Sequence, residues 1–338
     1  MQKTSNFFIV LTNTCNLKCK HCYDFKSNLN MTDSLLNKVE DYIIDSINNN
    51  QDENEFCINY VGGEITLYNQ TRLISSIKKI KERCKSKTIR FLSQSNLSTD
   101  LSDTSLEFFK LLDEIGTSYD PLIRFTSYNQ KIKWIENIRK IQSLGVPIRL
   151  TITLTKQCIE TLNPETLLDF MLALNIKILE FNRYFPTLSD TVFTNVLPKN
   201  DKVRDWTYSL FIQYLKIKKA CDFSCVNLDC LIDSFEGNYN WEHGRTCTLD
   251  NETFSPNGDI STCMLMQKKP IYNLLRNEKL NNKEDILKEE QNIPDLCKQC
   301  KYLKYCKGDC QRCIFDETGC TTAYKIYDYL EEMQKLKS

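Results

Sequence analysis

Short apolar runs alternate with amphipathic stretches over the first 180 or so residues of the chain. Residues 7–12 are five apolar residues followed by Thr12, which predicts a buried strand. Residues 32–48 carry apolar side chains at helical spacing behind Thr32 or Asp33 as the N-cap. By the same criteria we expect further strands near 56–61, 88–93, 115–118, 146–153 and 176–181, and helices near 70–83, 103–113, 129–143 and 164–174. This repeated alternation of strand and helix indicates an α/β fold with a parallel sheet.

Polar or glycine-rich residues follow each predicted strand. In a barrel-like α/β fold these positions share the carboxyl rim, where ligands bind. The candidates are the loop with Cys15, Cys19 and Cys22, then Gly62-Gly63-Glu64, Gln94-Ser95-Asn96, Ser118, Arg124 and Asn182-Arg183. Any one of them is equally well explained as an ordinary loop residue. The prediction of a site therefore depends on their convergence beside the cysteine loop.

The alternation stops after residue 185. Residues 201–219 predict one long helix, and Cys221, Cys225 and Cys230 follow as a loose cluster in a hinge region. From residue 247 the chain becomes rich in cysteine. We therefore expect a barrel domain over 1–200, a helical linker over 201–245 and a cysteine-rich domain over 246–338.

Composition narrows the class of protein. The 338 residues are 41% apolar and carry 44 basic and 44 acidic side chains. The charges cancel, so the excess of basic residues that is typical of nucleic-acid-binding proteins is missing. No apolar run is long enough to span a membrane, and the N-terminus has no secretory signal. The chain nevertheless contains 17 cysteines, many in CxxC-type clusters. In a cytoplasmic protein, which we expect here, such clusters are typical of metal centres rather than disulfides.

Two cysteine groups carry the candidate chemistry. Cys15-x3-Cys19-x2-Cys22 offers three thiolates to one compact metal centre and leaves a fourth position open, which favours a reactive centre over a structural one. In the second group, Cys247 and Cys263 flank an Asn257-Gly258 hairpin signal. The remaining members of that group are Cys297, Cys300, Cys306, Cys310, Cys313 and Cys320. On spacing alone this second group fits structural zinc as well as iron and sulfur.

Both groups resemble the signatures of one enzyme superfamily. The first resembles the CxxxCxxC motif of radical S-adenosylmethionine enzymes. The second resembles their C-terminal SPASM domain, since ten residues separate Cys247 from Gly258, four separate Gly258 from Cys263, and a C-x2-C-x5-C-x3-C run begins at Cys297. The resemblance implies a partial (β/α)6 TIM-like barrel followed by a small α+β SPASM domain.

The resemblance also implies cofactors. A [4Fe–4S] cluster on Cys15, Cys19 and Cys22 would bind S-adenosylmethionine at its open iron, cleave it reductively to a 5′-deoxyadenosyl radical and so abstract hydrogen from a substrate. Gly62, Gly63 and Glu64 match the motif for the methionyl amino group, although Ile65 replaces the proline often found next. By the same resemblance, His21 would lie near adenine, Ser95 or Asn96 near the ribose and Ser118 near the carboxylate. Arg124 is a further candidate, with a surface salt bridge as its alternative.

Two auxiliary [4Fe–4S] clusters follow from the same resemblance, giving three clusters in total. Cys247, Cys263 and Cys310 would hold the first auxiliary cluster. Cys297, Cys300, Cys306 and Cys320 would hold the second, with Cys313 as a rival for the last place. The fourth position of the first cluster is either open or filled by Cys221, Cys225, Cys230 or Cys313. Three other cysteines, Cys57, Cys84 and Cys158, lie in strand or helix patterns and are expected to be buried apolar residues.

The run from 297 to 312 is locally basic, with Lys298, Lys301, Lys304, Lys307 and Arg312 against Asp309. These cations either form a solvated face or a docking patch for an acidic electron donor such as flavodoxin or ferredoxin, or for a leader peptide.

Three functions remain open from the sequence. The first is maturation of a ribosomally made precursor peptide by a thioether, carbon–carbon or carbon–oxygen link or by epimerisation. Because the first strand begins by residue 7, we expect any leader peptide to be read directly or by a separate protein. The second is a formylglycine-generating sulfatase maturase, against which stands Met264, where those relatives place an acidic base. The third is a non-catalytic zinc or iron–sulfur protein.

Overall fold

A computed structural model describes residues 5–22, 28–120, 123–125, 127–185, 195–237, 250–266, 269–310, 312 and 315–337. One 11-stranded sheet runs through these residues in the order β11-β10-β9-β8-β1-β2-β3-β4-β5-β6-β7. Neighbouring strands from β1 to β7 are parallel, and β8 is parallel to β1. The first seven strands are β1 (Ser5–Val10), β2 (Glu55–Val61), β3 (Thr88–Gln94), β4 (Glu114–Ser118), β5 (Ile148–Leu154), β6 (Ile178–Arg183) and β7 (Ser224–Cys225).

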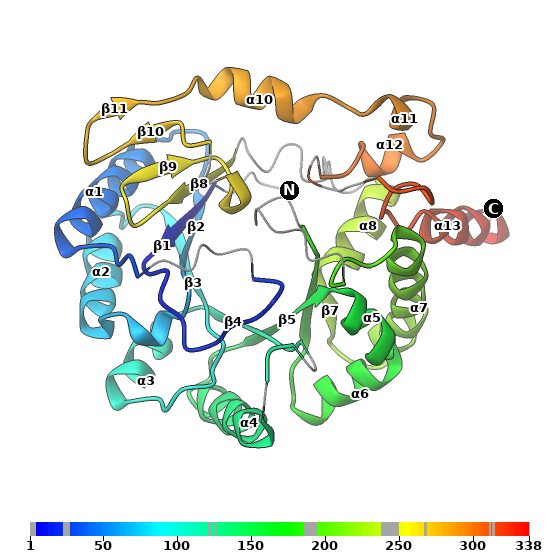
Figure 1. Cartoon of the computed structure of the whole chain (residues 1–338), viewed down its shortest axis with the longest axis horizontal. Helices are drawn as coiled ribbons and strands as arrows, with labels where there is room; N and C mark the ends of the chain where they lie inside the picture. Colours follow the sequence, from blue (N-terminus) through cyan, green and yellow to red (C-terminus); the bar gives the residue numbers. More distant parts are fainter. Residues whose placement is uncertain are drawn as a thin grey trace.

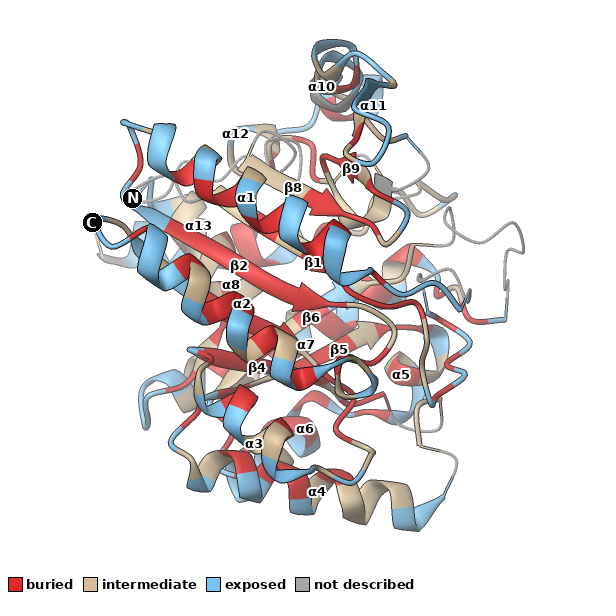
Figure 2. Cartoon of the chain, turned by 90° about the vertical axis from the view of Figure 1, so that its left-hand side faces the viewer, coloured by how far each residue is buried: buried red, intermediate tan, exposed pale blue. Residues whose placement is uncertain are grey.

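Helices surround the outside of this curved sheet (Figure 1). They are α1 (Asp33–Asn49), α2 (Gln70–Arg83), α3 (Asp103–Lys110), α4 (Tyr128–Ser143), α5 (Lys156–Thr161), α6 (Pro164–Ala173), α7 (Asn200–Lys218) and α8 (Val226–Glu236). Figure 2 shows that α1 and α2 bury one side and expose the other, as their apolar spacing predicts. Thr32 is the N-cap of α1, and its side chain accepts a hydrogen bond of 3.2 Å from the backbone N–H of Leu35.

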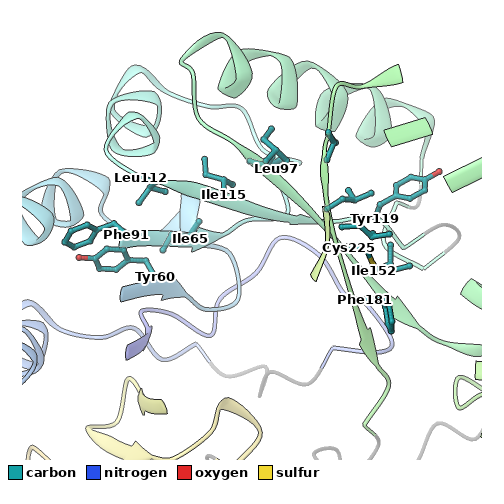
Figure 3. Close-up of a cluster of buried hydrophobic side chains, with 14 of the residues drawn as sticks. Tyr60, Ile65, Phe91, Leu97, Leu112, Ile115, Tyr119, Ile152, Phe181 and Cys225 are labelled. Atoms are coloured by element: carbon teal, nitrogen blue, oxygen red, sulfur yellow. The ribbon is translucent and has the colours of Figure 1, made fainter. Parts of the chain in front are cut away.

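The apolar core lies mainly between the sheet and the helices. Figure 3 shows part of it, including Tyr60, Phe91, Ile115 and Ile152 from four different strands. Cys57, Cys84 and Cys158 are buried, which confirms their expected role as apolar residues. No helix in the described part of the chain is long and apolar enough to cross a membrane.

The C-terminal elements are joined to the barrel through the sheet itself. Strand β8 (Asn251–Phe254) pairs with β1 and forms an antiparallel hairpin with β9 (Asp259–Ser261), as the Asn257-Gly258 signal predicts. The sheet then continues through β10 (Tyr272–Asn273) and β11 (Glu278–Lys279). Helices α10 (Lys283–Gln291), α11 (Asp295–Lys298), α12 (Leu303–Cys306) and α13 (Lys325–Lys337) follow.

Two features differ from the sequence expectations. The region predicted as a hinge contains β7, a seventh parallel strand, and the helix α8. The sheet is extended by β8 instead of ending at six strands, and among the described strands it does not close between β7 and β11. The division into domains 1–200, 201–245 and 246–338 stays a prediction, and the expected boundary near 240 lies outside the described residues.

Candidate functional site

The three-cysteine loop leaves the carboxyl end of β1, as expected. Cys15 is half-buried, Cys19 is buried and Cys22 is exposed. The backbone N–H of Leu17 donates to the sulfur of Cys15 at 3.4 Å, and the N–H of Cys22 donates to the carbonyl of Cys19 at 3.2 Å. The first of these bonds is of a kind that tunes the sulfur ligands of iron–sulfur clusters.

Gly62 and Gly63 bring the end of β2 against the backbone of this loop. The N–H of Gly63 donates to the carbonyl of Thr12 at 2.6 Å, and the N–H of Glu64 donates to that of Thr14 at 2.9 Å. A Cβ atom on Gly63 would lie 2.7 Å from the carbonyl carbon of Thr14, so no side chain fits there. The missing side chains therefore make room for the cysteine loop itself.

Glu64 ties the ends of β2 and β3 together. Its carboxylate is buried and accepts hydrogen bonds from the side chain of Ser95 at 2.6 Å and the backbone N–H of Asn96 at 2.7 Å. It also accepts from the hydroxyl of Thr66 at 2.8 Å. Such a carboxylate holds Ser95 and Asn96 in one arrangement.

Asn96 extends this network to the first cysteine. Its side-chain amide donates to Asn16 at 2.8 Å and lies 3.7 Å from the sulfur of Cys15. Its carbonyl oxygen accepts from Ser98 at 2.6 Å, and the amide of Asn16 donates back to Ser98 at 2.9 Å. Asn16 and Ser98 were not among the predicted site residues, because neither follows a strand directly.

A second network centres on Asp120, just after β4. This buried carboxylate accepts from Arg124 at 2.9 Å and from the backbone N–H of Thr153 at 2.8 Å, and lies 3.3 Å from Nε2 of His21. Burial alone would raise the pKa of Asp120, but Arg124 and His21 outweigh it and hold the pKa well below its usual value. Asp120 follows the predicted strand at 115–118, but it was not among the predicted site residues.

Arg124 and His21 connect Asp120 to the cysteine loop. Burial would lower the pKa of Arg124, but Asp120 and the thiols of Cys19 and Cys22 raise it above the ordinary value, so both thiols lie within electrostatic reach. His21 is buried, and its Nδ1 atom has no hydrogen-bond partner among the described residues. A buried ring nitrogen of this kind fits a site that is completed by a ligand.

The remaining predicted residue, Ser118, belongs to neither network. Its hydroxyl accepts a hydrogen bond of 3.1 Å from the side chain of Gln94, which comes from the neighbouring strand β3. Within the described residues, no three Cys, His, Asp or Glu side chains already stand in metal-binding geometry. The donor chemistry of the loop fits a three-thiolate cluster, and its sulfurs would be gathered when iron binds.

The cysteines of the second group that the structure describes lie on short turns and helices between β9 and α13. Cys297 and Cys306 are buried, Cys300 is exposed, and Cys263, Cys310 and Cys320 are half-buried. Burial, and to a lesser degree the charges of Asp309, Cys300 and Cys320, raise the pKa of Cys306 to about 12. Cys300 and Cys320, two further predicted ligands of the second auxiliary cluster, therefore each lie within electrostatic reach of Cys306. Cys247 and Cys313 lie outside the described residues.

One predicted ligand of the first auxiliary cluster, Cys310, borders a cavity. An ion pair between Arg183, at the end of β6, and the buried Asp309 joins the barrel to the C-terminal segment. The backbone N–H of Cys310 donates to the same carboxylate at 2.6 Å. The adjoining cavity has a volume of about 150 Å³, and its lining includes Phe181, Arg183, Thr207, Asn227, Cys310 and Thr322.

The hinge cysteines do not gather at this place. Cys225 pairs with Leu179 in the amino-terminal half of β6 and is fully buried among core side chains, where burial raises the pKa of its thiol (Figure 3). Cys221 is exposed, and its thiol donates to the carbonyl of Ile217. Cys230 is half-buried on α8, and burial raises its pKa to about 11. These positions argue against Cys221 and Cys225 as cluster ligands.

Three lysines of the basic run are already paired. Lys298 lies 2.6 Å from Asp295, Lys301 lies 2.9 Å from Asp328 and Lys304 lies 3.7 Å from Glu331. All three lysine side chains are more than half exposed, so the pairs contribute little stability. The pairing favours a solvated face over a free cationic docking patch.

The glycine contact leads to a prediction. We expect Gly63→Ala to destabilise the fold by about 1–3 kcal/mol, because its methyl group overlaps the backbone of the cysteine loop. It should also reduce iron retention, measured by iron analysis and thermal unfolding. Gly145→Ala is the control: nothing lies within 4 Å of its Cβ position, and its φ of +78° alone costs about 1 kcal/mol. Equal iron content in both variants would contradict a role of Gly63 in shaping the loop.

Comparison with known proteins agrees with this geometry. Residues 7–134 match the model of a family described as a 4Fe-4S single cluster domain. The chain also superimposes on native anSMEcpe with bound AdoMet and the Cp18Cys peptide. That match has a TM-score of 0.78 and 18% identity, over 97% of this chain and 95% of that one.

A second solved structure is Streptococcus suis SuiB bound to precursor peptide SuiA. It matches with a TM-score of 0.61 and 17% identity, over 92% of this chain and 73% of that one. The chain has the fold of the radical S-adenosylmethionine enzymes. The expected partial α/β barrel is thereby confirmed, and the resemblance recognised from the cysteine motifs agrees with this fold and with the matched 4Fe-4S family.

No curated protein sequence matches the chain. At these identities the likeness establishes the radical S-adenosylmethionine fold, and the roles of individual residues stay proposals. Both superimposed proteins are described with a bound peptide, the first also with AdoMet.

Proposed function

We propose that this chain is a radical S-adenosylmethionine enzyme that modifies a peptide. The observation that supports it most directly is the position of the three-cysteine loop. The loop leaves β1 at the rim where β2, β3 and β4 end, and the networks of Glu64, Asn96 and Asp120 reach it from those three strands. One loop with three thiols, surrounded by fixed polar groups, suits a reactive cluster better than a structural zinc site.

In this proposal Cys15, Cys19 and Cys22 hold a [4Fe–4S] cluster. When bound, that cluster would supply the electron for the reductive cleavage of S-adenosylmethionine. Arg124 places a positive charge beside two of the thiolates, and Asp120 holds Arg124 there. The unpartnered Nδ1 of His21 provides one polar contact for the adenine side of the ligand.

The other cofactor contacts follow from the strand ends. The turn at Gly62 and Gly63 binds the methionyl amino group through its backbone, while the Glu64 carboxylate positions Ser95 and Asn96 for the ribose. Ser118, from the next strand, binds the methionyl carboxylate. Each of these groups is oriented by a hydrogen bond within the protein, so little reorganisation accompanies binding.

Two auxiliary clusters complete the proposed enzyme. Cys247, Cys263 and Cys310 hold the first, and Cys297, Cys300, Cys306 and Cys320 hold the second. The N–H of Leu265 donates to the sulfur of Cys263 at 3.4 Å, which repeats the arrangement at Cys15. The cavity beside Cys310 gives a substrate side chain access to the first of these clusters.

The substrate is a precursor peptide, in which the enzyme forms a thioether, carbon–carbon or carbon–oxygen link or epimerises a residue. A reductant such as flavodoxin or ferredoxin supplies electrons in the cytoplasm, and a separate protein can present the leader peptide. A sulfatase-maturating activity is the second candidate. Against it stands Met264, in a short helix right after Cys263, because it occupies the place of the expected base.

One assay tests the proposal. The protein is purified without oxygen, reconstituted, analysed for iron and sulfide, and mixed with dithionite and S-adenosylmethionine. We expect about twelve irons per chain and formation of 5′-deoxyadenosine. A colourless zinc protein, or one that forms no 5′-deoxyadenosine, would refute the proposed enzyme class. To separate the two candidate substrates, the loaded enzyme is offered a Cys-containing sulfatase peptide: its conversion to formylglycine would favour the sulfatase activity.

A further inference from the structure

The turn that carries Cys320 is built on the first turns of α7. Helix α7 has no side-chain cap of its own, and the carboxylate of Asp316 accepts the N–H of Asn200 at 2.8 Å instead. The side chain of Asn200 donates to the carbonyl of Gly319 at 2.7 Å, and the N–H of Asp201 donates to Thr318 at 3.1 Å. The helix N-terminus thus binds a segment more than a hundred residues away along the chain.

Arg204, one turn further along α7, completes this attachment. Its guanidinium donates to the carbonyl of Thr318 at 2.9 Å and to the carbonyl of Cys320. The ring of Tyr324 lies beside it, with a centroid distance of 5.4 Å. The residue is only 7% exposed. Arg204 therefore holds the backbone at Cys320 from a position shielded from water.

The charge of Arg204 has no ion-pair partner among the described residues. Asp316 is near enough to feel the charge but is engaged in capping α7. Arg183 differs, because it forms an ion pair with Asp309. A buried cation is costly unless a negative charge lies nearby, and an arginine stays protonated at physiological pH. Asp316 supplies one such charge from the helix terminus, and a thiolate at Cys320 would supply a second.

The charges next to an iron–sulfur cluster set its reduction potential. A cluster held by four thiolates is anionic, so a cation beside it stabilises the reduced form and raises the potential. Little water separates Arg204 from Cys320, so the effect is weakly screened. Lys301 and Lys304, by contrast, are exposed and paired with acids.

We propose that Arg204 is a positioning residue that fixes Cys320 and raises the reduction potential of the second auxiliary cluster. The inference rests on the proposed function, since it requires Cys320 to be a ligand of that cluster. Helix α7 then has two roles: it covers the barrel, and through Arg204 it positions and electrostatically stabilises an electron-transfer centre.

The test compares Arg204→Gln and Arg204→Lys with the unaltered protein, all reconstituted with iron and sulfide. Reduction potentials are measured by redox titration followed by electron paramagnetic resonance. We expect Arg204→Gln to shift one auxiliary signal to lower potential, or to lose about four irons, while the other two clusters are unchanged. Arg204→Lys keeps the charge, so it should restore most of the potential or of the iron. Lys202→Gln, an exposed lysine on the same helix, is the matched control and should shift nothing.

The results separate this inference from the proposed function. Should the unaltered protein load only about four irons, the auxiliary clusters and the role of Arg204 both fail. If it loads fully and Arg204→Gln changes neither potential nor iron content, only the role of Arg204 is refuted. Equal iron loss in both Arg204 variants would likewise refute the contribution of charge.

Discussion

Replacing Cys15, Cys19 and Cys22 together by alanine should abolish the formation of 5′-deoxyadenosine while leaving about eight irons per chain. Only the loop after β1 presents these thiols to the rim, and the predicted auxiliary ligands lie between β9 and α13 or beyond the described residues. The triple variant should therefore lose all cleavage of S-adenosylmethionine but only part of its iron. The measurements are iron analysis and chromatography of the nucleoside product after reduction with dithionite.

Cys84→Ala is a suitable control for this triple variant. Cys84 is buried at the end of α2, on the outer side of the sheet, and should affect neither cleavage nor iron content. Cleavage that persists in the triple variant would mean that the reactive centre lies elsewhere. Loss of all iron would mean that the three clusters do not assemble independently.

Asp120→Ala should be among the most destabilising single substitutions in the barrel, by about 3–5 kcal/mol. The substitution leaves the buried guanidinium of Arg124 without its counter-charge and His21 without its partner at Nε2. Removal of both charges is less costly than removal of one. The double variant Asp120→Ala with Arg124→Ala should therefore be more stable than Asp120→Ala alone.

Urea unfolding of the anaerobically purified variants measures this difference. Asp100→Ala is the matched control, because Asp100 pairs with Lys133 at 2.7 Å but is 90% exposed, so its loss should change stability far less than the loss of Asp120. Additive effects of the Asp120 and Arg124 substitutions would contradict the coupling. The same variants should also bind S-adenosylmethionine more weakly, since His21 loses the contact that orients its ring.

Local signals were sufficient for much of the fold. The apolar spacing and the Thr32 cap located α1 within a residue or two. This was possible because the residues that bury one face of a helix all lie within the helix itself. The same holds for β2 and α2. The two-residue strand β7 and the pairing of β8 with β1 were missed, since these pairings are decided by β6 and β1 rather than by the residues of β7 and β8 themselves.

The sequence predicted which residues approach the rim of the sheet. It did not predict the hydrogen bonds and ion pairs that connect them. Spacing identified the cysteine loop and the strand ends. The role of Asp120 depends on His21 and Arg124, which approach it from different segments, and the role of Arg204 depends on a turn that follows it by more than a hundred residues. Contacts between residues so far apart produce no periodic pattern in the sequence, so they could not be predicted from it.

The pairing of β1 with β8 affects how this protein is made. Phe7 and Phe8 lie opposite Glu252 and Thr253. One edge of β1 therefore stays unpaired until about three quarters of the chain has left the ribosome. Until then an apolar strand edge is open to pairing with other chains. Productive synthesis should therefore depend on chaperones or slow expression, and premature termination before residue 251 should yield aggregates rather than a separate barrel.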